Sequence, residues 1–292
     1  MKSRLVAVVS WILVLAGGSA PAAPPRGAGE SRFDLVAAAA RLDALHISIA
    51  GDLAELRATQ LLNYHRVEGG TAECMRAHGR PYNKLPYADF YRDFTDADLG
   101  YGNGRATIVD SLTAGTRRFE LNEYAGVHLR QAGVTDDVPV RPEDVGVLNG
   151  CRSPYEYRSY LDVDPPAGAY ELAAFEDMLA PVYRDRTVVD AWRGYDDCMR
   201  SRHGYDVGDD RSDFLFAWRF EGVPDSPEWR RGLAEMKAIF AADVDCRRPA
   251  YTAAMRLVDQ RLDAWKEKHR SELLAIRREW RNRVAAAAKL PR

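Results

Sequence analysis

The chain has 292 residues, 46% of them hydrophobic and 29% charged, and its formal net charge is −2. This length is sufficient for one large domain or two ordinary domains with a buried core. The near balance of charges argues against a protein that binds nucleic acid over its whole surface.

The first residues have the layout of a secretory signal peptide. Lys2 and Arg4 precede an apolar run from Leu5 to Ala16, and small residues around Ala22 are typical of a cleavage site. The apolar run is shorter than the roughly 20 residues of a membrane-spanning helix. We therefore expect a signal peptide over residues 1–22, a secreted or extracytoplasmic location, and no transmembrane span after signal removal.

Two helices are predicted at the start of the mature chain. A leader rich in Pro and Gly occupies residues 23–31, and the segments 32–46 and 52–75 carry apolar residues at helical spacing. Gly51 is the expected break between these two helices.

Aromatic residues are concentrated in the loop-rich region over residues 79–115. They are Tyr82, Tyr87, Phe90, Tyr91, Phe94 and Tyr101. Aromatic faces suit sugar or peptide ligands, so the four tyrosines of this region are candidates for a binding surface. The alternative is that the rings fill a core that a helix-poor segment could not otherwise build.

The rest of the chain is predicted to be mostly helical. Helices are expected over residues 117–131, 170–202, 226–246 and 251–288, with loops over 134–150 and 204–225. Pro181 predicts a kink or a fresh start inside the second of these helices. Ser226 and Pro227 are typical of a capping residue and the first helical position.

The last predicted helix is basic outside its apolar stripe. Between Arg247 and Arg292 there are more than twice as many Lys and Arg as Asp and Glu. Arg277, Arg278, Arg281 and Arg283 are the candidate contact residues for an anionic envelope polymer or another envelope protein. The alternative is that the helix packs along the acidic body, with its cations solvated or paired at modest energetic value.

Four cysteines in an exported chain are expected to form two disulfides. Cys74 and Cys198 each stand in Cys-Met-Arg, whereas Cys151 and Cys246 each stand in Cys-Arg-x-Pro. The chain is therefore interpreted as two related units, residues 32–165 and 166–292, that share this order of motifs. Duplicated units favour the pairs Cys74–Cys151 and Cys198–Cys246, and the two crossed pairings remain open.

No catalytic motif is present in the sequence. It contains no G-x-S-x-G, no H-E-x-x-H, no glycine-rich phosphate loop and no EF-hand loop. His78 and His203 follow the first cysteine of each unit, but the tight cysteine pairs typical of zinc sites are missing. The Asp-rich segments 96–98 and 206–213 lack the spacing of a calcium loop. No catalytic, metal or cofactor residue is therefore assigned.

Short motifs recur in a defined order along the mature chain. They are Cys74-Met75 with Gly79, Gly100-Tyr101-Gly102, Gly150-Cys151, Trp192 before Cys198-Met199 with Gly204-Tyr205, and Ala242 to Cys246. This order resembles exported proteins of unknown function from actinomycete-type bacteria, with paired Cys-Met segments and a long charged C-terminal helix. The chain departs from many of them in having Asn149 before Gly150 and no lipid-anchoring cysteine. The resemblance implies export and disulfide bonding and transfers no catalytic residue.

These observations predict a mainly α protein. It consists of two related disulfide-stapled helical units, with a loop-rich aromatic insertion in the first and a long basic C-terminal helix in the second. The predicted function is a non-enzymatic binding or structural module outside the cell or at its envelope. The alternative is a secreted hydrolase that uses dispersed carboxylates or a histidine.

Overall fold

A computed structural model describes most of the chain after the predicted leader. The described residues are 33–99, 114–134, 140–155, 160–161, 163–169, 176–209, 211–216 and 226–291. Contacts divide the chain into Met1–Phe33 and Asp34–Arg292, and the helices that the structure describes belong to the second unit. Within the described ranges the regular structure is helical and contains no strand, which confirms the mainly α prediction. None of these helices is both long enough and apolar enough to cross a membrane.

The N-terminal helices follow the sequence prediction closely. Helix α1 spans Leu35–Ala50 and α2 spans Leu53–Tyr64. A single π turn, His65–Gly69, joins α2 to α3 (Gly70–Ala77), so the predicted segment 52–75 is continuous in its helical character.

The break at Gly51 is confirmed and has a steric reason. Gly51 has a φ of +102°, a conformation that side chains disfavour. A Cβ atom at this position would lie 2.8 Å from the indole ring of Trp280. Asp52 then caps α2 in a capping box with Glu55, in which each side chain accepts a hydrogen bond from the other residue's backbone N–H.

The middle of the chain contains a helix that the sequence pattern did not indicate. After a 3-10 turn at Asp96–Leu99, α4 spans Ala114–Gln131, close to the predicted 117–131. A further 3-10 turn, Pro142–Asp144, leads into α5 (Val145–Arg152). The prediction of a loop over 134–150 is therefore wrong in its second half. Leu148 and Cys151 are buried on α5, and packing of these residues compensates for the glycines that weaken the pattern.

The predicted helix over 170–202 is divided into shorter helices. They are α7 (Glu176–Tyr183), α8 (Arg186–Trp192) and α9 (Tyr195–His203). Pro181 lies inside α7 rather than at a helix boundary. The boundary lies at Asp185, which caps the start of α8 by accepting a hydrogen bond from the backbone N–H of Thr187. Helix α10 (Arg211–Phe216) lies within the predicted loop over 204–225.

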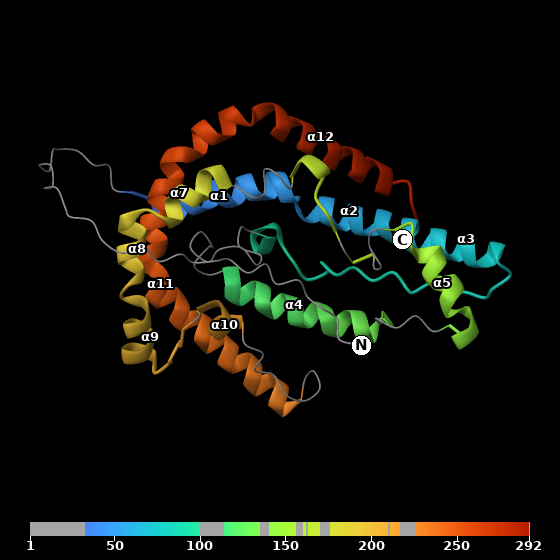
Figure 1. Cartoon of the computed structure of the whole chain (residues 1–292), viewed down its shortest axis with the longest axis horizontal. Coiled ribbons are helices and arrows are strands. Elements are labelled where there is room, and N and C mark those ends of the chain that lie inside the picture. Colours follow the sequence, from blue (N-terminus) through green and yellow to red (C-terminus); the bar gives the residue numbers. More distant parts are fainter. Residues whose placement is uncertain are drawn as a thin grey trace, which may run out of the picture. The chain divides into compact units, whose positions relative to one another are not determined.

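The two C-terminal helices are divided at a different place from the one predicted. Helix α11 runs without interruption from Pro227 to Lys268, through Pro249, and α12 spans Arg270–Ala287. The expected boundary between residues 246 and 251 is therefore wrong. The chain turns instead at His269, whose φ of −104° and ψ of 21° are not helical. Figure 1 shows that α12 runs in a different direction from α11.

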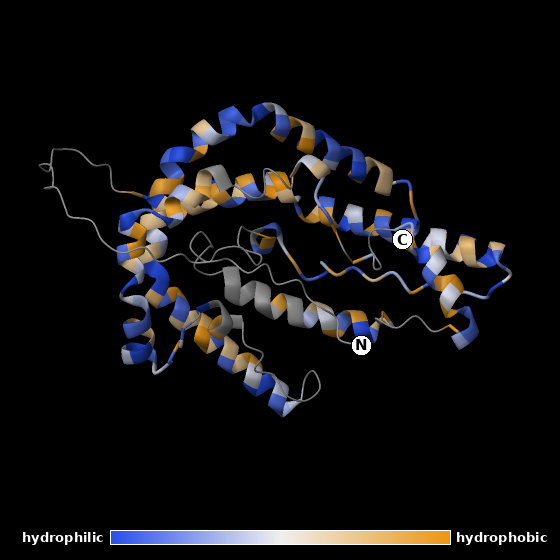
Figure 2. Ribbon diagram, in the orientation of Figure 1, coloured by the Kyte–Doolittle hydropathy of each residue, from blue (hydrophilic) through white to orange (hydrophobic). Residues whose placement is uncertain are grey.

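Helices from the two ends of the sequence pack together. Helix α11 contacts α1, α4, α7, α8 and α9, whereas α12 contacts α1 and α2. Figure 2 shows hydrophobic and hydrophilic residues interspersed along α11 and α12, as expected for helices with one buried face. The largest fully buried side chains include Trp280 of α12, Tyr195 of α9 and Tyr251 of α11. The core is therefore built between N-terminal and C-terminal segments.

Candidate functional site

The two disulfides pair as the duplicated motifs predict. Cys74 on α3 is bonded to Cys151 on α5, and Cys198 on α9 is bonded to Cys246 on α11. The Cα atoms are 5.6 Å apart in both bridges. The crossed pairings are wrong, and each bridge clamps one short helix against a partner.

The repeated Cys-Met-Arg motif forms the same local structure in both places. Met75 and Met199, which follow the first cysteine of each bridge, are both completely buried. The two helices then end at a glycine with positive φ, +66° at Gly79 and +74° at Gly204. The backbone N–H after each glycine donates back to the methionine carbonyl, which closes the helix end in the manner of a Schellman motif. The repeat therefore encodes a bridged helix with a buried methionine and a glycine cap.

The arginine that follows the second cysteine of the first bridge takes part in a buried polar cluster. Arg152 donates to the Glu68 carboxylate at 2.7 Å and to the Tyr82 hydroxyl at 2.9 Å. The Tyr82 hydroxyl in turn donates to Glu68 at 2.7 Å. Only 1% of the Glu68 side chain is exposed, so this carboxylate depends on these partners and on the backbone N–H of Leu85.

The second bridge has a cluster of the same chemistry. Arg247 lies 3.0 Å from the Asp243 carboxylate, and the Tyr195 hydroxyl donates to Asp243 at 2.8 Å. Arg247 and Asp243 are both almost completely buried. Burial raises the pKa of Asp243, although Arg247 and the Tyr195 hydrogen bond oppose this shift. Each bridge is thus accompanied by an arginine, a carboxylate and a tyrosine.

Sequence reasoning identified the cysteines of these clusters but not their polar partners. The available signal was the arginine in both Cys-Arg-x-Pro motifs. The acid and the tyrosine could not be found in the same way, because their positions relative to the cysteines differ. Glu68 precedes Cys74, whereas Asp243 precedes Cys246.

An open hollow lies beside the first bridge, between α3 and the following loop. Its volume is about 660 Å³. The lining residues are Tyr64, Ala72, Arg76, Arg80, Pro81, Tyr82, Asn83, Lys84, Leu85 and Pro86. Three cations and two tyrosines thus converge on one concave surface, and among the described residues that line it there is neither a carboxylate nor a histidine.

The cations of the hollow differ in how they are compensated. Arg80 lies 3.2 Å from the buried Asp144 carboxylate. The Lys84 ammonium lies 6.0 Å from the centre of the Tyr64 ring, at the limit of a cation–π contact. Arg76 is exposed on α3, and no carboxylate within the described part of the chain forms an ion pair with it or with Lys84. The hollow therefore presents positive charge that an anionic ligand could neutralise.

The predicted aromatic surface is only partly available. Tyr82 borders the hollow, but its hydroxyl is engaged by Glu68 and Arg152. Tyr87 packs against Tyr64 and Tyr160. Tyr91 packs against Phe90 and Phe94, and burial raises its pKa to about 12. Tyr101 lies outside the described residues.

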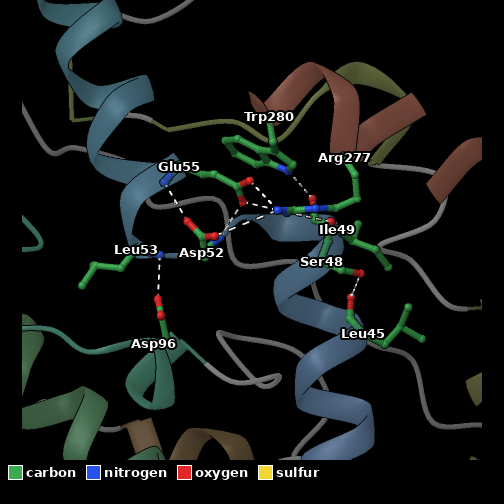
Figure 3. Close-up of polar contacts among 9 residues, drawn as sticks. All are labelled: Leu45, Ser48, Ile49, Asp52, Leu53, Glu55, Asp96, Arg277 and Trp280. Carbon is green, nitrogen blue, oxygen red and sulfur yellow. Dashed lines mark hydrogen bonds and ion pairs between the residues drawn. The ribbon is translucent and has the colours of Figure 1, made fainter. Parts of the chain in front are cut away.

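The four arginines of α12 fall into two pairs. Arg277 lies within 2.7 Å of both carboxylate oxygens of Glu55 and donates to the Ser48 carbonyl (Figure 3). Arg283 donates to the Asp164 carbonyl at 2.6 Å and lies over the Trp280 ring. Both are held against the protein, whereas Arg278 and Arg281 are exposed. As a contact surface for an external partner, α12 offers two arginines rather than four.

Three of the aspartates considered for calcium accept hydrogen bonds from the protein itself. Asp96 accepts a hydrogen bond from the backbone N–H of Leu53 (Figure 3), and Asp98 accepts from the N–H and hydroxyl of Thr95. Asp206 accepts from the N–H of Gly208 at 3.4 Å. Asp98 and Asp206 therefore act in local turns, whereas Asp96 joins its 3-10 turn to the start of α2.

Comparison with known proteins does not add a relationship. The chain matches no protein-family model, and neither the curated proteins nor the solved structures contain a significant match to it.

Proposed function

We propose that this chain is an exported, non-enzymatic binding module that uses the basic hollow to hold an anionic polymer of the cell envelope. The observation that carries the proposal is the convergence of Arg76, Arg80 and Lys84 with Tyr64 and Tyr82 on one concave surface. Guanidinium groups match carboxylate and phosphate in shape and charge, and tyrosine rings supply apolar faces for sugar units.

The composition of the hollow favours binding over hydrolysis. General acid–base catalysis of glycoside or peptide cleavage needs a carboxylate or a histidine within reach of the substrate. No such side chain lines the hollow in the part of the chain that the structure describes. The buried acids Glu68 and Asp243 are engaged in the clusters beside the disulfides, so they support the architecture rather than a reaction.

The test compares the loss of two cations from the hollow with the loss of two cations from α12. The mature chain is applied at low salt to phosphocellulose and to neutral cellulose, and retention is measured along a salt gradient. We expect Arg76→Gln with Lys84→Gln to weaken retention on phosphocellulose by about five- to tenfold, because two exposed cations are lost. The matched control is Arg278→Gln with Arg281→Gln on α12, which removes the same charge and should change retention little.

Three results would contradict the proposal. Equal loss of retention in both double variants would indicate binding by overall charge, and a larger loss in the α12 variant would place the contact surface on that helix. Retention must also fall with rising salt, because exposed charges are screened.

A further inference from the structure

A histidine lies beside each disulfide, and at the second bridge a carboxylate completes the group. His203 ends α9, five residues after Cys198, and Asp245 directly precedes Cys246 on α11. One ligand atom from each of Cys198, His203, Asp245 and Cys246 lies within 4.8 Å of the others. The bridge holds α9 against α11, which brings these four residues together from two distant parts of the sequence.

These donors are the types that zinc prefers. Two thiolates, one imidazole nitrogen and one carboxylate oxygen make a set of four, which matches the tetrahedral coordination of Zn²⁺. His203 and Asp245 already lie close, with Nε2 and Oδ2 3.1 Å apart. Their side chains are 29% and 45% exposed, so a metal ion can reach them from solvent.

In the oxidised protein the two sulfur atoms are bonded to each other and cannot act as thiolates. The structure therefore points to a site that exists in one redox state only. We propose that reduction of the Cys198–Cys246 bridge converts this corner of the protein into a zinc site with Cys198, His203, Asp245 and Cys246 as ligands.

The chemistry balances with a dithiol as the reductant. The dithiol transfers two electrons and two protons to the bridge and becomes a disulfide, which leaves Cys198 and Cys246 as thiols. Binding of Zn²⁺ then releases the two thiol protons, and the ion forms bonds to both sulfur atoms. The ion also replaces the contact between Asp245 and His203.

The first bridge provides an internal comparison. Cys74, His78 and Cys151 form a group of the same kind, but among the described residues it contains three donors and no carboxylate. Three ligands leave one position to water, so we expect weaker binding than at the complete set of four. The difference between the bridges is therefore itself a prediction of the proposal.

The test uses the mature chain with the first bridge removed by Cys74→Ala and Cys151→Ala. Cobalt(II) replaces zinc as the probe, because thiolate-bound tetrahedral cobalt absorbs in the near ultraviolet and strongly in the visible range. The bridge is reduced with a phosphine in the presence of cobalt, and far-ultraviolet circular dichroism is recorded in parallel. We expect one equivalent of tetrahedral cobalt in the reduced protein and none in the oxidised protein.

Zinc should displace the cobalt, and His203→Ala should weaken binding at least tenfold. The matched control is His78→Ala in the same background, which should leave binding unchanged. The proposal is overturned if the oxidised and reduced proteins give the same spectrum, or if His203→Ala binds as well as its parent. Loss of helical signal on reduction that cobalt neither prevents nor reverses would also overturn it.

Discussion

Each of the two disulfides lies beside a buried ion pair between an arginine and a carboxylate. Arg152 pairs with Glu68, and Arg247 pairs with Asp243, in positions where the carboxylates are almost completely buried. An unpaired charge in such a place costs several kcal/mol, so each arginine is required once its acid is buried. The arginine after the second cysteine therefore compensates the charge of a buried carboxylate beside each bridge.

The buried pair at Asp243 gives an unusual dependence of stability on pH. Burial raises the pKa of Asp243 in the folded protein above its ordinary value of 3.8. Between these two pKa values the folded chain binds more protons than the unfolded chain, so its stability increases as pH falls through that window. We expect the unfolding free energy of the wild type to rise relative to Asp243→Asn as pH is lowered from 7 towards 4, measured by urea unfolding.

Asp245 on the same helix should show the opposite pH dependence, because its pKa is lowered whereas that of Asp243 is raised. The hydrogen bond with His203, followed by that from Arg202, lowers the pKa of Asp245. Its contribution to stability is present above the unfolded pKa and is lost as pH falls through the lowered value. A wild type that loses stability relative to Asp243→Asn on acidification would show that Asp243 behaves in the same way as Asp245 and would contradict the prediction.

The junction between α1 and α2 shows how one position can determine the placement of a whole helix. Trp280 of α12 is completely buried and donates from Nε1 to the carbonyl of Ile49, the residue two before Gly51 (Figure 3). Arg277, one turn earlier on α12, pairs with Glu55 of the α2 capping box. Helix α12 therefore packs directly against the junction of α1 and α2, and residue 51 must leave room for the indole ring of Trp280.

Substitution of Gly51 tests this arrangement. We expect Gly51→Ala to lower the unfolding free energy by about 2 to 4 kcal/mol, because the positive φ is strained and the new Cβ would meet the Trp280 ring. Gly69→Ala is the matched control, since its added Cβ meets nothing within 4 Å, and it should be neutral or stabilise by up to about 1 kcal/mol. Denaturant unfolding of the two variants checks both values. Equal effects would show that the contact with Trp280 is unimportant.

The sequence predicts some helix boundaries correctly and others wrongly. Gly51, Asp52 and Ser226 carry local signals, and the helix starts and breaks at these residues agree with them. Pro249 is a local signal that tertiary structure overrides. It lies exposed on α11, while its neighbours Arg247 and Ala250 are buried, so packing stabilises the helix despite one missing hydrogen bond.

The turn at His269 shows the opposite case. Trp265, Ile276 and Trp280 continue one apolar stripe across it, and all three are buried. The sequence pattern therefore contains no interruption at this point. The change of direction arises because α12 packs against α1 and α2, which are more than 200 residues away in sequence. A long-range contact of this kind leaves no signal in local periodicity.

At the scale of the whole molecule, the disulfide pairing was predictable and the basic hollow was not. The pairing follows from matching motifs around the cysteines, which are visible in the sequence. The hollow depends on the loop over residues 80–86 lying against α3 and against Tyr64 at the end of α2. Arg76 and Lys84 gain a shared role only from that packing, and their spacing alone resembles an ordinary solvated surface.

The two bridges also predict how the whole protein should respond to their removal. Cys74–Cys151 and Cys198–Cys246 close separate loops with sequence separations of 77 and 48 residues. In the chain-entropy account each loop restricts the unfolded chain independently and stabilises folding by about 4 kcal/mol. We expect the Cys74→Ala/Cys151→Ala and Cys198→Ala/Cys246→Ala variants each to lose about that amount in denaturant unfolding, and the fourfold variant to lose the sum.

The losses of unfolding free energy should add because the two loops do not overlap in sequence. Unfolding itself should be cooperative because the two halves share a core. Helix α1 packs on α11 and α2 packs on α12, so neither half can unfold without exposing the buried face of the other. Tryptophan fluorescence and far-ultraviolet circular dichroism should therefore report one coincident transition in the wild type and in both double variants. Two separated transitions would show that each half unfolds on its own. A fourfold variant that departs from the sum by more than about 1 kcal/mol would show that the two bridges do not restrict the unfolded chain independently.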